Sequence, residues 1–366
     1  MFSRKPSTCR TFALIGAPSG LRHYEQDGDL DTNQDLPRCR RGWLGWALGI
    51  VCLYAAPAFV SAAESNQADF RAKELPPGVV YTNYQVAEGP WSIHVVQIQR
   101  TNATYGIHLR HAGGGVLGLS TLRAQITDAA AVVGEPIAAI NGGFYQRDKV
   151  YAGAARGLQV REGELLSAPS GSATFWIDVL GEPHLEEVAS QFEITWPDGR
   201  RTPFGLNGDR GTNGVALYTS AIGTSTLTTN GQELVLERQA TGRWLPLRIG
   251  QTYSARVREI RDGGNTQLAQ DDLVLSLSPA VMGKFQNIKT GDTLNIATAT
   301  SPGVRGVRTA LSGGPALVRA GKRVKIAAPA SESYEFSSML ERHPRSAIGW
   351  NSGMRSWSVR CLPPKK

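Results

Sequence analysis

Short strand-like runs separated by turn signals fill residues 181–300, and this pattern limits the fold more than any other feature. Pairs and triplets such as Asn230-Gly231 and Asp262-Gly263-Gly264 are typical of tight turns between strands. The runs between the turns are 215–218, 233–237, 252–260, 273–277 and 293–298. We therefore expect an α+β fold: a single β-rich domain of mixed and antiparallel sheet with few helices.

One helix is expected over residues 121–133, where Leu122, Ile126 and Val133 fall on one face. Ser120 is suited to cap its start and Gly134 to end it. Further strands are predicted at 79–86, 91–99, 105–110, 136–140, 157–160, 164–167 and 173–179. His108 and His111 end on the polar side of one such strand. No further ligand cluster accompanies them, so we interpret them as solvated histidines rather than a metal pair.

The amino-terminal region has the features of an export signal. Arg38, Arg40 and Arg41 precede an apolar run, 43–60, which is followed by Ser61-Ala62-Ala63. A signal peptide at 38–63 predicts a periplasmic or secreted protein without stable membrane association after cleavage. A retained membrane anchor is the alternative, because the run is long enough to span a bilayer.

These features divide the chain into five parts. A polar leader, 1–37, precedes the signal, and we hypothesise that it is over-called sequence with the true start near Leu36. Residues 64–78 form a linker, 79–350 the folded domain and 351–366 an aberrant tail without Asp or Glu.

Composition excludes several classes of site. Three cysteines lie in the first 63 residues and Cys361 near the end, so the domain has no disulfide framework and no cysteine-bound metal. The chain has 39 basic and 31 acidic residues. Seven of the basic and five of the acidic residues lie in the first 63 residues, so the remainder carries a net charge of +6, spread along the sequence. That spread gives no support for nucleic-acid binding and weakly favours anionic ligands.

Three motifs carry the candidate chemistry. The first, 139–145, is a strand end followed by Asn141-Gly142-Gly143-Phe144-Tyr145. The second, 310–318, puts Gly313 and Gly314 at the entry of a strand. The third, 342–349, places Arg342 and Arg345 on either side of His343-Pro344. Glycine allows close backbone approach, and a fixed guanidinium can bind phosphate or carboxylate. Taken singly, the first motif also fits an ordinary Asn-Gly turn and the arginines fit surface ion pairs.

Together, and with Asn207 and Arg210, these motifs resemble the phosphodiester glycosidase family, whose bacterial members are exported and linked to exopolysaccharide metabolism. The resemblance covers about 76–350. Family members continue past the third motif with apolar strands and a terminal Asp-Gly-Gly-Gly-Ser loop. This chain ends without either, as a truncated or frame-shifted product would.

The resemblance implies hydrolysis of a sugar-1-phosphodiester, such as an N-acetylglucosamine derivative, into a free sugar and a phosphomonoester. It assigns the phosphate to Arg345, with Arg342 second, and sugar or phosphate oxygens to Asn141, Gly142 and Gly143. Phe144 would wall one side and Gly313 and Gly314 the other, with Asn207 and Arg210 at the rim. No cofactor and no metal is implied. Asp148, Asp209 and Glu341 are the nearest carboxylates, and each fits a surface role better than that of a catalyst.

Two alternatives to an active hydrolase stay open. The chain could be a non-catalytic glycan or phosphosugar binder that keeps the pocket walls, or an inactive truncated product. The missing terminal loop, which carries an aspartate in the family, favours either alternative for this chain. The intact motifs favour an active enzyme for its ancestor.

Overall fold

The computed structural model of the protein describes residues 10–15, 75–87, 91–101, 104–112, 116–147, 150–239, 244–285, 287–326, 344–351 and 356–362. Strands dominate this part of the chain, with α1 (Leu122–Val133), the single-turn α2 (Pro279–Met282) and two 3-10 turns, Ser220–Ile222 and Gly283–Phe285. The predicted α+β fold rich in mixed and antiparallel sheet is confirmed.

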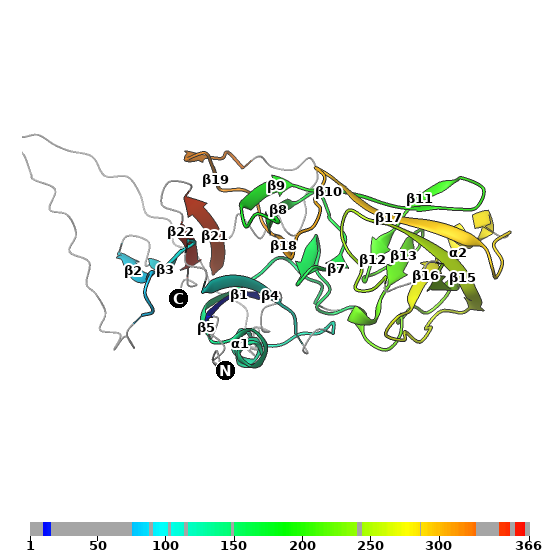
Figure 1. The fold of residues 1–366 in the computed structure, drawn as a ribbon, viewed down its shortest axis with the longest axis horizontal. Helices are drawn as coiled ribbons and strands as arrows, with labels where there is room; N and C mark the ends of the chain where they lie inside the picture. Colours follow the sequence, from blue (N-terminus) through cyan, green and yellow to red (C-terminus); the bar gives the residue numbers. More distant parts are fainter. Residues whose placement is uncertain are drawn as a thin grey trace, which may run out of the picture.

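The largest sheet has eight strands in the order β11-β10-β17-β15-β14-β16-β13-β12 (Figure 1). All neighbours are antiparallel except β12 and β13. Leu217, Leu234, Leu275 and Ile296 are fully buried between its strands and the neighbouring sheet. The strands are β10 (Ala189–Thr195), β11 (Arg201–Pro203), β12 (Gly205–Leu206), β13 (Val215–Tyr218), β14 (Gln232–Arg238), β15 (Thr252–Asp262), β16 (Leu273–Leu277) and β17 (Thr293–Ser301).

A five-stranded sheet adjoins it, in the order β7-β6-β18-β8-β9. Four of its strands precede the eight-stranded sheet in sequence, and β18 follows it. The chain enters and leaves the larger sheet at neighbouring points, because Ala189 and Ser301 are paired. The strands are β6 (Gln159–Arg161), β7 (Glu164–Ser167), β8 (Ala173–Ile177), β9 (Pro183–Glu187) and β18 (Thr309–Ser312).

Two further sheets lie beyond the five-stranded one (Figure 1). One contains β2 (Val79–Val86), β3 (Trp91–Gln99), β22 (Ser356–Leu362) and β21 (Arg345–Asn351), in that order. The other contains β4 (Tyr105–Arg110), β1 (Arg10–Ile15) and β5 (Pro136–Asn141), with α1 covering it. A small hairpin, β19 (Val318–Arg319) and β20 (Lys322–Arg323), follows β18.

The structure corrects three sequence-based expectations. Thr121, not Ser120, caps α1, because the Thr121 hydroxyl accepts the Ala124 N–H at 3.1 Å. The tail, expected to lack a long apolar strand, contributes β22, whose sequence Ser-Trp-Ser-Val-Arg-Cys-Leu alternates polar and apolar residues as a strand does. The leader contributes β1, which no strand prediction covered. The division of the chain into leader, signal, linker, domain and tail stays a prediction.

Glu162 connects three segments that are distant in sequence. It lies in the turn between β6 and β7, where it accepts a hydrogen bond from His108 on β4 and one from Arg308 before β18, both at 2.7 Å. The bonds from His108 and Arg308 lower the pKa of Glu162 to about 2. His108 is therefore paired, contrary to the solvated position expected for it.

We expect Glu162→Gln to cost about 1 kcal/mol of unfolding free energy at pH 7, a modest value because this carboxylate is partly exposed. A carboxyl with a depressed folded pKa stabilises above its ordinary value of 4.5, and that contribution disappears as the pH falls through about 2. Urea melts at pH 7, 4 and 2 should show the difference from wild type shrinking. Glu186→Gln, at an exposed glutamate on β9, is the control. A difference as large at pH 2 as at pH 7 would contradict the ionic origin.

Candidate functional site

The first and second motifs meet in the structure. Gly143, just after β5, lies against the end of β18: a Cβ atom on Gly143 would stand 2.0 Å from the carbonyl oxygen of Ser312. No side chain fits in that space, so glycine is required there for the two segments to approach. The contact brings the two glycine-bearing segments together, and their roles as walls of a binding site stay a prediction.

Ser312 is fixed in place by its neighbours. Its hydroxyl accepts the Leu158 N–H and bonds the Thr174 hydroxyl, each at 2.8 Å, and its own N–H donates to the Leu158 carbonyl. Gly157 packs on the other side, where a Cβ would stand 2.6 Å from the Ser312 Cβ. Two glycines therefore enclose this serine, which is 5% exposed.

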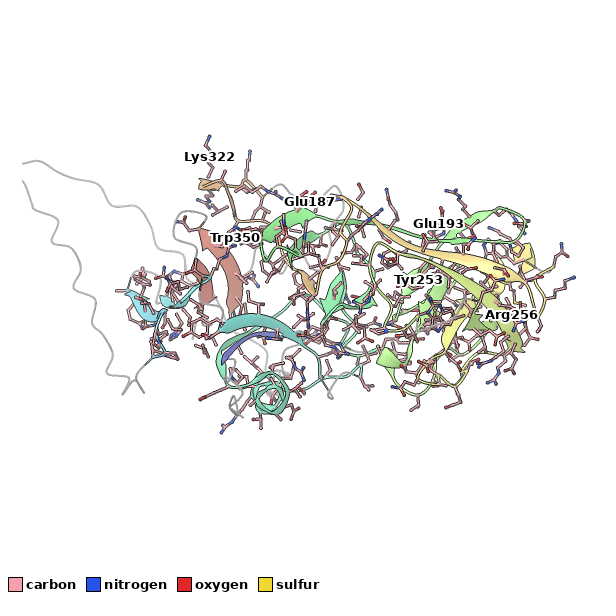
Figure 2. All side chains as sticks on the ribbon, in the orientation of Figure 1. Glu187, Glu193, Tyr253, Arg256, Lys322 and Trp350 are labelled. Carbon is pink, nitrogen blue, oxygen red and sulfur yellow. The ribbon has the colours of Figure 1, made fainter. Side chains whose placement is uncertain are left out.

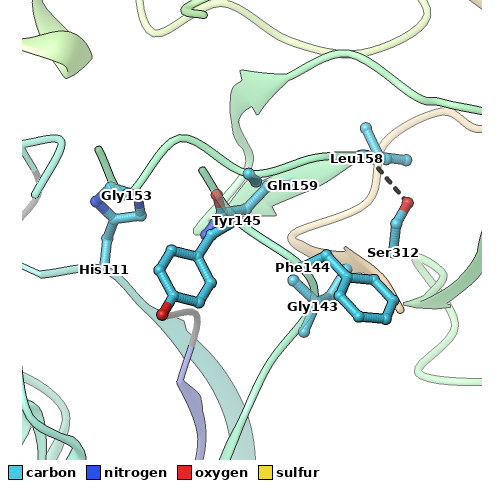
Figure 3. Close-up of a pocket in the computed structure, with 11 residues that line it drawn as sticks. His111, Gly143, Phe144, Tyr145, Gly153, Leu158, Gln159 and Ser312 are labelled. Atoms are coloured by element: carbon cyan, nitrogen blue, oxygen red, sulfur yellow. Dashed lines mark hydrogen bonds between the residues drawn. The ribbon is translucent and has the colours of Figure 1, made fainter. Parts of the chain in front are cut away.

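A pocket opens beside this contact (Figure 3). Its volume is about 10 Å³, room for roughly one water molecule. Phe144 and Ser312 lie at one end and His111 and Tyr145 at the other. The lining residues are His111, Gly143, Phe144, Tyr145, Gly153, Ala155, Gly157, Leu158, Gln159, Leu311 and Ser312, none of them a carboxylate. A sugar does not fit inside and would have to bind over the pocket mouth.

His111 is the titratable imidazole of this pocket. Burial lowers the pKa of His111 from its ordinary value, although the hydrogen bond to the Val116 carbonyl opposes the shift. Nδ1 donates to that carbonyl at 3.0 Å, which fixes the neutral tautomer and leaves Nε2 as the acceptor nitrogen. His111 was expected to be solvated, and the structure instead places it in the pocket wall.

Asn141 ends β5 immediately before Gly142 and Gly143. Its side-chain oxygen is buried and has no hydrogen-bond partner among the described residues. A buried acceptor without a donor costs free energy, so each such atom needs an explanation. Arg210 Nε, outside the pocket, is also buried without a partner in the described part of the chain, and the role of Asn141 as a site residue stays a prediction.

Gly313 and Gly314 continue from Ser312 at the same end of β18. The Gly313 N–H donates to the Ala173 carbonyl at 2.9 Å, and a Cβ on Gly313 would meet nothing within 4 Å. Gly314 is exposed. Both glycines lie next to the pocket but neither lines it.

Arg345 begins β21 and is paired in register with Leu362 of β22. It is not among the pocket-lining residues. Its strand nevertheless packs on the same part of the molecule: Trp350 stacks at a tilt on Phe175 of β8, with ring centroids 5.9 Å apart, and Ile348 joins the apolar cluster that holds Ile140 and Leu311. Arg342 and the carboxylates Asp148 and Glu341 lie outside the described residues.

Asn207 and Arg210 take part in the eight-stranded sheet instead of a pocket rim. Asn207 is 4% exposed, and its amide bonds the Leu166 carbonyl and the Thr219 hydroxyl and N–H. Arg210 donates to Asn230, Ser276 and the Leu277 carbonyl. Asp209 accepts the Gly211 N–H in the turn between them. These contacts give all three a structural role.

A second polar cluster surrounds Glu233 on β14, which is fully buried. Its carboxylate accepts hydrogen bonds from the hydroxyls of Thr226 and Thr228 and from the Thr266 N–H, at 2.8–3.0 Å. Burial opposes ionisation, but these donors outweigh it and lower the pKa of Glu233 below its ordinary value. With every oxygen bonded, Glu233 anchors loops 226–228 and 266 to the sheet rather than forming a catalytic centre.

The sequence-based prediction missed several pocket residues, notably His111, Gly153 and Ser312, whereas Tyr145 belongs to the predicted motif. The Gly-rich stretch 113–115 next to His111 and the serine before Gly313 were the available signals. Among the residues that the structure describes, no group of three or more His, Cys, Asp or Glu side chains could hold a metal ion. Within the same residues, no helix has the length and apolar character needed to cross a membrane.

Comparison with known proteins supports the fold. No family model and no curated protein matches the chain. A solved protein from Synechocystis, whose name assigns it no function, aligns with 78% of this chain at 18% identity and a TM-score of 0.59. A protein from Burkholderia pseudomallei K96243, provisionally named as exported, aligns with 76% at 15% identity and a TM-score of 0.54. The alignments span 50% and 62% of those two chains.

Proposed function

We propose that this chain is an exported hydrolase that cleaves a sugar-1-phosphodiester in envelope or exopolysaccharide material. The observation that carries the proposal is the direct contact between the Asn141-Gly142-Gly143 turn and the end of β18 at Ser312. This contact joins two segments that lie about 170 residues apart in sequence and that the resemblance assigns to opposite sides of one pocket. The signal-like segment 38–63 and the name of the Burkholderia protein support export.

In this reaction, water adds to C1 of the sugar while the bond from C1 to the phosphate oxygen breaks. The sugar keeps the new hydroxyl, and the phosphate leaves as a monoester with a proton. Arg345 would bind the phosphate and Asn141 a substrate hydroxyl or the water. The neutral His111 supplies a nitrogen able to accept a proton at the pocket wall.

Binding without turnover is the second candidate, because the pocket lining contains no carboxylate and the cavity holds only about one water. The partner is then the same phosphosugar or polysaccharide, held by the motif backbone and Arg345. No nucleic-acid role is proposed.

Sugar release separates the two candidates. We expect the purified chain to release N-acetylglucosamine from its 1-(methyl phosphate) diester, and Arg345→Ala and Asn141→Ala to reduce the rate about 100-fold. Arg256→Ala, a change at an exposed ion pair on β15, is the control for general effects. Saturable binding without release would favour the binder, and neither binding nor release would refute both.

A further inference from the structure

The leader strand β1 occupies the centre of its sheet. It runs parallel to β4 along all six residues, from Arg10–Tyr105 to Ile15–Arg110. It also runs parallel to β5, with an irregularity between Thr11 and Ala13. Among the described strands, β1 is the partner of both, so without it β4 and β5 each present an unpaired edge. Neighbouring strands are about 4.8 Å apart, so the gap would have the width of one strand.

The walls of this gap are apolar. Leu109 of β4 and Ile140 of β5 are 0% and 4% exposed, and Ala129 of α1 is fully buried. A strand that lies between a helix and an apolar cluster is expected to be apolar along its length, as the strands of buried parallel sheets are. Phe12-Ala13-Leu14-Ile15 fits that requirement. The site therefore has two rows of backbone hydrogen-bonding groups and apolar surfaces above and below.

Export separates β1 from this site. Cleavage at the end of the predicted signal peptide, 38–63, removes residues 10–15 from the body. The cleaved form keeps β4, β5 and α1 but has no β1. This step rests on the export included in the proposed function.

We propose that the groove between β4 and β5 is a strand-binding site, which in the exported body takes a predominantly apolar strand of about six residues from another polypeptide, parallel to both edges. β1 shows the chemistry and direction of the occupant. Backbone bonds to two edges provide affinity, and the apolar walls select the sequence, as in other cases of strand addition.

The test uses the full chain with a specific protease site inserted between Ala62 and Ala63, cut after folding. A labelled peptide with the sequence Arg10–Ala17 should bind the cut protein saturably and raise its melting temperature in a concentration-dependent way. The same peptide with Ala13→Pro should bind at least about tenfold more weakly, because proline removes a strand N–H. A peptide of reversed sequence should bind equally weakly.

Equal binding of the three peptides would overturn the proposal. Two further results would overturn it. In the first, the cut protein has lost its leader, melts at the same temperature as the uncut chain and does not bind the peptide. In the second, the cut protein dimerises and fills the site with a second copy of itself. Sugar release is measured separately, so failure here leaves the hydrolase proposal to its own test.

Discussion

Gly143→Ala is expected to destabilise the protein by about 3 kcal/mol or more, because the added methyl group overlaps backbone that has nowhere to move. The Cβ would stand 2.0 Å from the Ser312 carbonyl oxygen. Ser312 cannot retreat, since Leu158, Thr174 and Gly157 hold it from the other side. Urea denaturation followed by tryptophan fluorescence measures the loss.

Gly313→Ala is the matched control, since Gly313 directly follows Ser312 in the sequence. A Cβ there meets nothing within 4 Å, so stability should change by less than about 0.5 kcal/mol. If Gly313 also approaches substrate, its alanine variant loses sugar binding without losing stability. Equal midpoints for the Gly143 and Gly313 variants would show that the segments are not in contact as described.

Glu233→Gln is expected to cost about 2–3 kcal/mol, because an amide places N–H groups against a site made of donors. The carboxylate accepts from Thr226, Thr228 and Thr266 and is fully buried. Glu237→Gln, on the same strand and in a partly exposed ion pair with Arg256, should cost less than about 1 kcal/mol.

The cost of Glu233→Gln should also depend on pH. The folded pKa of Glu233 is depressed, so the carboxylate stabilises the fold above its ordinary value of 4.5, and this contribution is lost as the pH falls from 4.5 through the folded value. Thermal melts between pH 3 and 8 would show the two proteins converging at low pH. A constant difference across that range would mean that packing, not charge, is responsible.

Local signals in the sequence were sufficient for most of the fold. Alternating runs between glycine turns predicted strands such as β14 and β16, and the capped apolar face predicted α1. β1 was missed because its partners lie about 95 and 125 residues away, and no local pattern encodes such pairing. The site was predicted in part: Gly143 was identified from its motif, whereas His111 depends on the burial that the Val116 turn creates. Asn207 and Arg210 were wrongly placed at the pocket rim. The sequence does not distinguish a polar residue that hydrogen-bonds the backbone inside a sheet from one at the rim of a pocket.

The pairing of Ala189 with Ser301 has a consequence for how this chain varies and assembles. Everything between those residues leaves the site-bearing sheet and returns at one point. Glu187 lies just before this point, at the end of β9, and Glu193 lies beyond it, on β10 (Figure 2). Residues 189–301 thus have the connectivity of an inserted module. Loops within them can lengthen or shorten without altering the spacing between β9 and β18. The two parts share one buried apolar cluster, which includes Leu158, Val160 and Ala310 as well as residues of the larger sheet.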